Sequence, residues 1–463
     1  MRRLWTRGIC VKGFAQNDTI AAQATPTGEG GVAIVRISGP ACREVLTRVF
    51  AAENGRPLAP RRLTFGQILD GESAIDEAMA VLMPAPHSYT REDVAEIQCH
   101  GSQALVSRIL ALLLRAGARM AAPGEFTYRA FLNGRIDLAQ AEAVMRMIRA
   151  GSERAMRSAH RQMEGGVSSF VRQAREAITE VLAGLSAAVD FPDEIEETLA
   201  SGQISERCAD IAARLRAACD ARAGRIDDEG LRVVLAGRPN AGKSTLLNAL
   251  VGGERAIVTD VPGTTRDTLT ESITVRGVRI VLTDTAGLRD TDDPVERIGV
   301  TRARQAIEQA DVRALVLDAS LPLTSEDRDA LGGLSPQLIV LTKGDLPTSV
   351  GEEEILAQFP GVPAIMVCAR TGEGMELLRD ALTSFAPEEA GESCALTQAR
   401  HVEAALRACD SLDDAVRAIA DGYPLDMAAI DLSAALDALG EITGETMRES
   451  VIDEVFSRFC VGK

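Results

Sequence analysis

The stretch Gly237-Arg238-Pro239-Asn240-Ala241-Gly242-Lys243-Ser244 fits the pattern G-x-x-x-x-G-K-[ST]. It follows a strand-like run and opens a helical pattern, which is the context that a phosphate-binding loop requires. Glycines let backbone N–H groups wrap phosphates, and the N-terminus of the following helix adds partial positive charge. We expect Lys243 to reach the β- and γ-phosphates of a nucleotide and Ser244 to bind Mg²⁺. A chance match to the pattern is the alternative.

A second motif lies about forty residues further along the chain. Asp284-Thr285-Ala286-Gly287 follows the strand-like run 280–283 and suits a D-x-x-G loop. In such a loop we expect Asp284 to touch the Mg²⁺ shell and Gly287 to donate its N–H to the γ-phosphate.

A third motif concerns the base of the nucleotide. Thr342-Lys343-Gly344-Asp345 follows another strand-like run and resembles the guanine-reading pattern [NT]-K-x-D. Asp345 can accept hydrogen bonds from N1 and N2 of guanine, which adenine cannot supply, and Lys343 packs along the base. Thr342 in place of Asn weakens one contact. Cys368-Ala369-Arg370 stands where GTPases usually read S-A-K, which is a loose match. Because the four signals come in the order found in GTPases, the sequence predicts GTP rather than ATP.

The residues around these loops bear on hydrolysis. Thr265, within Gly263–Asp267, lies where a switch threonine must reach Mg²⁺, although a plain turn is the alternative. Leu288 follows the D-x-x-G loop, where signalling GTPases place a glutamine that orients the attacking water. Leucine cannot do this, so either hydrolysis is slow or another group supplies the contact. The amide oxygen of Asn240 is of the kind that binds hard cations, so a monovalent cation near the β–γ bridge is permitted.

Composition bounds the class of protein. The chain has 463 residues, which suggests about three domains, and its 46% apolar and 25% charged residues exclude disorder and collagen-like repeats. A net charge of −17 argues against a protein that coats nucleic acid through charge alone, so we expect a basic partner or a local basic patch. No apolar run is long enough to span a bilayer. Nine scattered cysteines without a CxxC pair favour a reducing compartment over a disulfide framework or a zinc site.

Periodicity predicts a multidomain fold. Strand-like and helical runs mix from residue 18 to about 133, which predicts an α+β domain, whereas residues 138–225 and 397–459 have helical spacing. From residue 231 strands alternate with helices, which predicts a mostly parallel sheet covered on both faces. We therefore expect an α/β P-loop GTPase domain inserted into an all-α helical domain. The expected boundaries are 1–16 for an N-terminal extension, 17–134 for the α+β domain, 135–228 with 388–463 for the helical domain, and 229–387 for the GTPase domain.

Individual elements are expected where apolar runs are clearest. A helix is expected over 102–116, with Gly117 as its C-cap. The expected strands are 31–37, 78–83 and 94–98 in the α+β domain, and 232–236, 280–283, 314–318, 338–341 and 364–368 in the α/β domain.

The first sixteen residues carry Arg2, Arg3, Arg7 and Lys12 and no acidic residue. An organelle transit peptide has this charge, but the segment is short and poor in serine. We therefore expect a tail or an over-extended start on a cytoplasmic protein, with mitochondrial localisation as the alternative if the segment is a transit peptide.

Longer stretches of sequence carry a specific resemblance. They include Gly31–Pro40 (GVAIVRISGP), Pro123–Glu142 (PGEFTYRAFLNGRIDLAQAE), Asp284–Gly299 (DTAGLRDTDDPVERIG) and the closing Phe459–Lys463 (FCVGK). From about Asp18 to the last residue, the chain resembles the tRNA uridine-5-carboxymethylaminomethyl modification GTPases of the TrmE/MnmE type.

The resemblance implies a function as well as a fold. Its N-terminal domain would dimerise and bind a 5-formyl-tetrahydrofolate-type one-carbon carrier. The GTPase domains of the homodimer would meet through their switch regions in the presence of K⁺. In a heterotetramer with an FAD-dependent partner subunit, the protein would modify C5 of the wobble uridine of certain tRNAs.

The resemblance also implies roles in the GTPase domain. Glu296 would help to place the hydrolytic water, and Arg266 would stabilise the closed loop; a solvated acid at a helix start and a surface ion pair are the alternatives. Mg²⁺ would be held by Ser244 and Thr265. Four residues would surround K⁺, through the backbone carbonyl in the case of Val261: Asn240, Thr259, Val261 and Thr264. The residues assigned to GTP are Asn240, Ala241, Gly242, Lys243, Ser244, Thr245, Thr259, Asp260, Val261, Pro262, Gly263, Thr264, Thr265, Asp284, Thr285, Ala286, Gly287, Thr342, Lys343 and Asp345.

A folate site is implied in the N-terminal domain. Arginines suit the carboxylates of the glutamate tail of a folate, and Glu96 suits the N–H donors of the pterin. Ordinary salt bridges are the alternative. The four residues that match the family's site are Arg36, Glu96, Arg135 and Lys463. Arg135 replaces the lysine often found there, so the charge is kept but not the geometry.

Two departures from the family pattern lie in stretches that we expect near the folate. Arg91 stands where the family usually has glycine, which would exclude a left-handed backbone conformation or add a phosphate contact. Ser102 stands where the family usually has the second glycine of H-G-G.

The resemblance implies that Cys460 lies beside the folate pocket. Its thiol would act as a nucleophile, a redox partner or an acceptor site, and a small buried hydrophobe is the alternative.

Two other functions stay open. One is a non-catalytic RNA-binding switch such as a ribosome-assembly GTPase, although the C-terminal segment has no strand pattern suited to a KH domain. The other is a folate enzyme with a regulatory GTPase.

Overall fold

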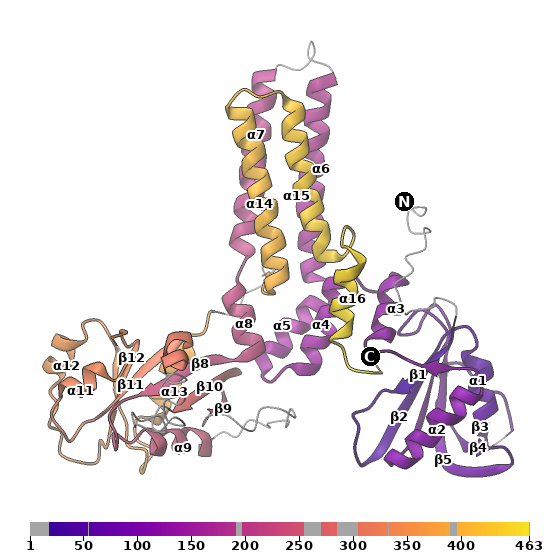
Figure 1. The fold of residues 1–463 in the computed structure, drawn as a ribbon, viewed down its shortest axis with the longest axis horizontal. Coiled ribbons are helices and arrows are strands. Elements are labelled where there is room, and N and C mark those ends of the chain that lie inside the picture. The colour runs from indigo at the N-terminus through magenta and orange to yellow at the C-terminus, as the bar shows by residue number, and fades with distance from the viewer. Residues whose placement is uncertain are drawn as a thin grey trace, which may run out of the picture. The chain divides into compact units, whose positions relative to one another are not determined.

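The structure is a computed structural model that describes residues 18–53, 55–190, 197–253, 270–284, 304–331, 333–388 and 396–462. It separates into two compact units (Figure 1). The first unit contains the residues up to Met145, Gln162–Ile211 and those from Asp410 on, and the second unit contains Arg146–Arg161 and Ala212–Cys409. No helix among the described residues is long and apolar enough to cross a membrane.

The first unit contains a seven-stranded sheet in the order β3-β4-β5-β6-β2-β1-β7. Helices α1 (Cys42–Val49) and α2 (Gln103–Arg115) pack on it, and alternate residues of β2 such as Val35 and Ile37 face them in the core. All neighbouring strands are antiparallel except β1 and β7. The strands are β1 Ile20–Gln23, β2 Gly30–Ser38, β3 Phe50–Ala52, β4 Thr64–Asp70, β5 Ser73–Met83, β6 Val94–Gly101 and β7 Arg119–Met120.

Long helices make up the rest of the first unit. The portions of α6 (Gly166–Asp190), α7 (Glu197–Ala218), α14 (Ala399–Ala420) and α15 (Leu425–Thr443) that belong to this unit lie side by side (Figure 1). These helices carry apolar residues at three- and four-residue spacing, as in α6 at Ile178, Val181 and Leu185. Two further helices of the unit, α3 and α4, are Glu125–Leu132 and Leu138–Arg149, the last turn of α4 lying in the second unit.

An aromatic cluster fixes the C-terminal end of the chain. The ring of Phe456, on α16 (Glu449–Ser457), lies 5.1 Å from that of Tyr128 on α3 and 5.2 Å from that of Phe459. The N–H of Gly124 donates to the carbonyl of Cys460 at 3.3 Å. These contacts hold the last residues against the N-terminal part of the first unit.

The second unit contains a six-stranded sheet in the order β13-β12-β11-β8-β10-β9, parallel except for the edge strand β9. Separate apolar clusters cover its two faces. The strands are β8 Leu231–Ala236, β9 Thr270–Val275, β10 Val278–Asp284, β11 Val312–Asp318, β12 Leu338–Thr342 and β13 Ala364–Met366. The helices are α8 Ala221–Glu229, α9 Lys243–Gly253, α11 Ser325–Asp329, α12 Glu352–Gln358 and α13 Met375–Ser384, with most of α5 (Glu153–Met163).

The predicted fold class is confirmed: an α+β part, a helical part and an α/β part all occur. The five strands expected in the α/β domain are present, and β2, β6 and α2 lie where they were expected. Strand β5 begins at Ser73, earlier than the expected 78–83. Strands β1, β3, β4, β7 and β9 were not expected. Strands β4 and β9 mix polar and apolar residues, and β1, β3 and β7 are four residues long or shorter, whereas the expected strands were found as longer apolar runs.

Candidate functional site

The loop between β8 and α9 leaves the sheet at its carboxyl edge. A Cβ on Gly237 would lie 2.2 Å from the carbonyl oxygen of Val316 on β11, so only glycine fits there. Gly242 and Asn240 have φ values of 89° and 66°, and asparagine tolerates this left-handed conformation better than most residues. Glycine is therefore required at Gly237 by a close backbone contact and favoured at Gly242 by a left-handed backbone conformation.

Lys243 and Ser244 begin α9 inside this loop. The Lys243 ammonium is 4% exposed and donates to the carbonyls of Gly237 at 2.7 Å and Arg238 at 2.8 Å. Ser244 Oγ donates to Asp284 Oδ2 at 2.8 Å. The loop thus brings together a lysine for phosphates and a hydroxyl beside a carboxylate, and both of these oxygens are ligands of the kind that Mg²⁺ prefers. Thr245, the next residue, is exposed on the first turn of α9.

Mg²⁺ fits this donor set only together with the phosphates of a nucleotide. Within the described ranges, no group of three or more His, Cys, Asp or Glu side chains is placed to hold a metal. A phosphate-bound Mg²⁺ needs few protein ligands, because the ion keeps water and phosphate oxygens in its shell. Ser244 and Asp284 are sufficient for that arrangement.

Thr342 joins the phosphate loop to the sheet. Its Oγ1 lies 2.6 Å from the carbonyl oxygen of Ala241 and 3.1 Å from that of Leu317, and it can donate to either. The side chain is buried at 4% exposure. The Thr342 hydroxyl therefore contacts the phosphate loop directly, and a weaker contact than that of asparagine stays a prediction.

The guanine-reading motif is held by acidic and basic partners. Lys343 donates to Asp318 at 2.5 Å; burial works against ionisation of Asp318, but hydrogen bonds from Lys343 and Ser320 outweigh it and lower the pKa of this carboxyl. Asp345 accepts from the Cys368 thiol at 3.3 Å and from Arg370 at 2.5 Å.

These contacts keep Asp345 anionic. The hydrogen bond from Cys368, followed by the positive charges of Arg370 and Lys343, lowers the pKa of Asp345. A carboxylate in this state accepts hydrogen bonds, as guanine recognition requires. Sequence reasoning missed Asp318 and did not assign Arg370 a role. The position of an acid at the carboxyl end of a parallel strand was the available signal for Asp318.

A second cluster lies in the first unit around Tyr89. Arg36 on β2 faces Glu96 on β6 in the strand register, and their side chains pair at 2.8 Å. The guanidinium groups of Arg36 and Arg135 lie 5.2 Å and 4.7 Å from the centroid of the Tyr89 ring. Arg36 also donates to the carbonyl of Gly462 at 3.4 Å. Three of the four residues expected to bind folate therefore converge on one aromatic ring, which sequence reasoning had missed.

The chemistry of the Tyr89 cluster fits a folate. An aromatic ring flanked by guanidinium groups can stack a pterin, and Glu96, whose side chain is 17% exposed, supplies an acceptor for ring N–H groups. Gly462 has a φ of 96°, and a Cβ there would lie 2.0 Å from the carbonyl oxygen of Gln23. The closing segment can therefore reach this cluster only with glycine at that position.

Many of the expected site residues lie outside the described residues. They are Thr259, Asp260, Val261, Pro262, Gly263, Thr264, Thr265, Arg266, Thr285, Ala286, Gly287, Glu296 and Lys463. The structure thus describes the phosphate loop, Asp284 and the guanine motif in the second unit and, as a separate site, the Tyr89 cluster in the first unit.

Comparison with known proteins gives the family. The model of the MnmE helical domain matches residues 138–460, and that of the GTP-binding protein TrmE N-terminus matches residues 19–135. The tRNA modification GTPase MnmE of Symbiobacterium thermophilum is 47% identical over 454 residues, which cover 96% of this chain and 99% of that protein. The chain belongs to the MnmE family of tRNA modification GTPases.

A second relative from another organism supports the same family. The tRNA modification GTPase MnmE of Heliobacterium modesticaldum is 45% identical, with 96% of this chain and 99% of that protein covered. Among solved structures, the G domain of the T. maritima FeoB iron transporter is 28% identical and covers 34% of this chain and 98% of its own, with a TM-score of 0.25.

Arg91 departs from the MnmE pattern without the expected effect on the backbone. Its φ is 60°, so this arginine adopts the left-handed conformation that it was expected to exclude. Its side chain donates to the carbonyl of Asn133 at 2.9 Å. The bond across to the loop after α3 holds the residue in this strained conformation.

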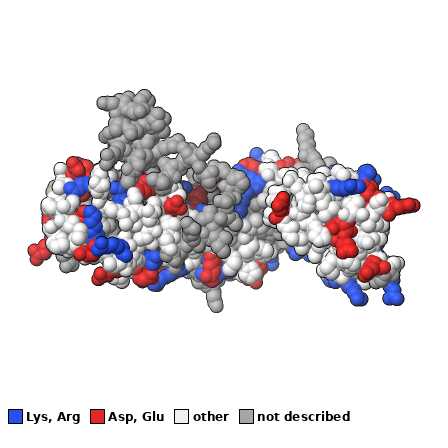
Figure 2. Space-filling model, turned by 90° about the horizontal axis from the view of Figure 1, so that it is seen from below, with Lys and Arg blue, Asp and Glu red and all other residues white. Residues whose placement is uncertain are grey.

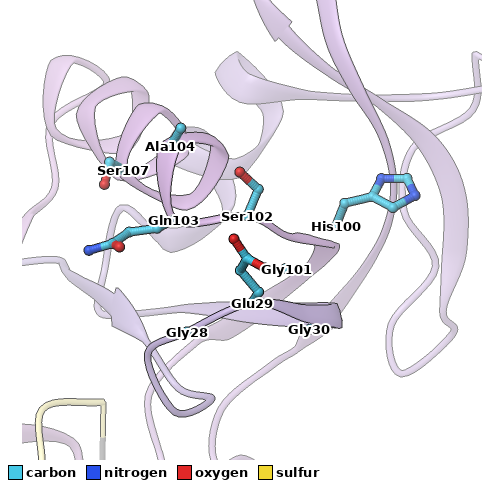
Figure 3. Close-up of a pocket in the computed structure, with 9 residues that line it drawn as sticks. All are labelled: Gly28, Glu29, Gly30, His100, Gly101, Ser102, Gln103, Ala104 and Ser107. Atoms are coloured by element: carbon cyan, nitrogen blue, oxygen red, sulfur yellow. The ribbon is translucent and has the colours of Figure 1, made fainter.

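Ser102 lies away from the Tyr89 cluster, contrary to expectation. Gly101 at the end of β6 pairs with Gly30, whereas Glu96 pairs with Arg36, so the two sites are about 17 Å apart along the strands. With Glu29 and Gln103, Ser102 borders a separate cavity of about 810 Å³ (Figure 3). The His100 ring points away from these side chains and bonds Asp76 at 2.7 Å.

Cys460 is exposed, which contradicts the alternative of a buried hydrophobe. By contrast, Cys42, Cys99 and Cys208 are buried. Cys460 lies two residues before Gly462, whose backbone carbonyl accepts a hydrogen bond from Arg36 of the Tyr89 cluster.

Proposed function

We propose that this protein is a K⁺-activated GTP hydrolase that acts with an FAD-dependent partner subunit. Together they add a carboxymethylaminomethyl-type group to C5 of the wobble uridine of certain tRNAs. Membership in the MnmE family supports this proposal. The observation that carries it is the meeting of Lys243, Ser244 and Asp284 at one edge of the sheet.

In the GTPase domain, residues of this chain position the phosphates of the nucleotide and select its base. Lys243 exchanges two loop carbonyls for phosphate oxygens, and Asp345 selects guanine through its two acceptor oxygens. Ser244 and Thr265 would hold Mg²⁺, which neutralises charge on the phosphates when bound. Glu296 would position water, and Arg266 would close the loop over the site. The K⁺ ligands would be Asn240, Thr259, Val261 and Thr264.

In the N-terminal domain, the Tyr89 cluster would bind a 5-formyl-tetrahydrofolate-type carrier. Arg36, Glu96 and Arg135 are supported by their geometry around Tyr89, and Lys463 would complete the set. The exposed Cys460 thiol would take part in the group transfer there. We propose the domain boundaries 17–134, 135–228 with 388–463, and 229–387, and dimerisation through the first of these domains.

Charge supports the need for a partner. The chain has a net charge of −17, and on the face seen in Figure 2 basic and acidic side chains alternate in small groups. A polyanion such as tRNA is held poorly by such a surface. We propose that the FAD-dependent subunit supplies basic surface in a heterotetramer, and that the complex works in the cytoplasm.

Nucleoside mass spectrometry of bulk tRNA tests the proposal. In cells that lack this gene, carboxymethylaminomethyl-type uridine should disappear and should return with the wild-type chain. Cys460→Ser should fail to restore it, whereas Cys219→Ser, a change at a half-buried thiol of the second unit, should succeed. Restoration by Cys460→Ser would keep the pathway but remove the thiol from the chemistry.

An unchanged uridine profile would contradict the proposal. The alternative would then be a ribosome-assembly GTPase that binds RNA without modifying it. Retention of folate with no dependence on GTP would instead favour a folate enzyme with a regulatory GTPase.

A further inference from the structure

A basic cavity in the first unit shares Arg135 with the Tyr89 cluster. Its volume is about 610 Å³, and it is lined by the loop after α3, by α6 and by the end of α15. Four arginines line it, against two carboxylates, Asp137 and Glu445. The arginines are Arg91, Arg135, Arg172 and Arg175. In a chain with a net charge of −17, this local excess of positive charge marks a place for an anion.

Ser168 gives independent support for a ligand. Its side chain lines the cavity, is 3% exposed, and its hydroxyl has no hydrogen-bond partner among the described residues. A buried hydroxyl without a partner is destabilising, so such groups are rare unless something binds them. The Nε of Arg175 is likewise buried without an acceptor.

The arginines differ in how far they are engaged. Arg175 pairs with Glu445, Arg91 donates to the Asn133 carbonyl, and Arg135 donates to the Tyr89 carbonyl at 2.7 Å. Arg172 is exposed and has no side-chain partner in the part of the chain that the structure describes. Each of the first three keeps further N–H donors, because a guanidinium carries five. The cavity therefore offers donors on several sides.

The shape of the site favours a small, chain-like anion over a nucleic acid. Phosphodiester backbones need an open track of basic side chains, whereas here the hydroxyl that lacks a partner is buried within a bounded cavity. A flexible chain that carries several carboxylates can reach both Ser168 and the arginines around it.

Arg135 belongs both to this cavity and to the proposed folate site. A folate extends from its pterin through a glutamate, and cellular folates carry further γ-linked glutamates, each adding one carboxylate. We propose that the cavity binds this oligoglutamate tail, with Arg172 and Arg175 on the outer carboxylates and Ser168 bonded to one of them. This inference rests on the folate site proposed above.

Binding of folates with different tail lengths tests the inference. The full-length protein is titrated with mono- and pentaglutamyl 5-formyl-tetrahydrofolate, and with γ-pentaglutamate alone. We expect the pentaglutamyl form to bind about tenfold more tightly, which corresponds to two added contacts between partly exposed charges. Arg172→Gln removes one of the two contacts, so it should reduce the gain from about tenfold to about threefold and leave the affinity for the monoglutamyl form and the GTPase rate unchanged.

Two further variants complete the design. Arg43→Gln removes the same charge from the exposed face of α1, outside the cavity, and should keep the full gain. Ser168→Ala should reduce the gain without destabilising the fold, because it removes a hydroxyl that has no partner in the protein.

Several outcomes would overturn the inference. They are equal affinity for both tail lengths, an equal loss in Arg172→Gln and Arg43→Gln, and displacement of γ-pentaglutamate by inorganic pyrophosphate or a single-stranded RNA at equal or lower concentration. Displacement by pyrophosphate would reassign the cavity to phosphate, and displacement by the RNA would reassign it to RNA. If neither folate binds, the proposed folate site fails; γ-pentaglutamate that binds wild type but not Arg172→Gln would then still support the cavity, and no binding would overturn it.

Discussion

Single side chains connect the strands to the loops at the carboxyl edge of the second sheet. Thr342 reaches the phosphate loop, Lys343 reaches Asp318, and Asp345 is reached by Cys368 and Arg370. The phosphate and guanine ends of the site are therefore connected through one short segment that begins at the last residue of β12.

Thr342→Val tests this link. The variant keeps the shape of the side chain but leaves the Ala241 carbonyl without its donor, so the free energy of unfolding should fall by about 1–2 kcal/mol. GTP affinity should fall with it, because the loop loses its tie to β12. Urea unfolding and nucleotide titration measure the two effects. Thr274→Val, a half-buried strand position on β9, should change neither; equal effects of both variants would remove the link.

Asp345→Asn tests base reading. The carboxylate accepts two N–H groups of guanine, whereas an amide offers one acceptor and a donor. The affinity for GTP should fall by about 100-fold, and affinity for xanthosine triphosphate, which has a carbonyl at position 2, should rise. Competition binding with both nucleotides provides the measurement. A variant that still prefers GTP would mean that Asp345 does not read the base.

The chemistry of these residues could be predicted because the motifs themselves encode it. A pattern such as G-x-x-x-x-G-K-[ST] specifies glycine where a side chain would strike Val316 and lysine where phosphates arrive. The roles of Arg370 and Tyr89 could not be predicted, because each depends on a partner far away in the sequence. Asp318 was missed although its position at the carboxyl end of a parallel strand was an available signal.

At the scale of elements, a network of ion pairs joins β1, β7 and α3. Arg129, 6% exposed, contacts Asp18 at 2.6 Å and Glu125 at 3.0 Å, and Arg119 contacts the same two carboxylates. Glu92 also pairs with Arg129 at 3.2 Å. Because Glu125 is fully buried, the network depends on every charge keeping its partner.

The network predicts sensitivity to acid. Burial works against ionisation of Asp18, but hydrogen bonds from Arg119 and Arg129 outweigh it and lower the pKa from its ordinary value of 3.8. Because the folded-state pKa is the lower one, this stabilisation is present above pH 3.8 and is lost as pH falls through the folded value. Asp18→Asn should weaken the dependence of the free energy of unfolding on pH below about pH 5. The difference from the wild type should be about 1 kcal/mol or less.

Asp70→Asn provides the comparison for this pH experiment. Arg108 and Arg115 lower the pKa of Asp70 as well, chiefly through the Arg108 hydrogen bond, but these partners are exposed. Salt at 0.5 M, where screening acts over about 4–5 Å, should abolish the effect of Asp70 and leave most of that of Asp18. If salt reduced the effects of Asp18 and Asp70 equally, the ion pairs of Asp18 would be no better shielded from dissolved ions than those of Asp70.

Elements with long apolar runs were predictable, and mixed ones were not. Residues 338–341 are apolar throughout and are recognisable as a buried parallel strand. Strand β4, with Gly66 and Gln67, and strand β9, with alternating burial, are stabilised by pairing with neighbours that a local pattern does not reveal.

At the scale of the whole molecule, the proposed cycle requires GTPase domains that meet in the presence of K⁺. Asn240 has a φ of 66°, so alanine there would add backbone strain to the loss of the amide. Asn240→Gly keeps the conformation and should lose K⁺ stimulation, whereas Asn240→Asp keeps an oxygen and should retain part of it. GTP turnover in K⁺ and in Na⁺ measures this. Stimulation of the glycine variant equal to wild type would rule out a cation role for Asn240.

The order of the three structural parts was readable from composition, because the change from helical spacing to alternating strands is abrupt near residue 231. It was harder to predict from the sequence which distant segments lie next to one another. The convergence of Gly462 on Gln23 and Arg36 depends on backbone geometry near the chain end, which no periodicity reports.

The exposure of Cys460 has a practical consequence for spectroscopy. The buried thiols, with pKa values raised to about 11 or 12 at Cys42, Cys99 and Cys208, should react slowly with maleimides at neutral pH. With Cys10 and Cys394 changed to serine, a fluorescent dye would attach preferentially at Cys460. Its emission would then follow occupancy of the Tyr89 cluster in real time, without the partner subunit or a tRNA.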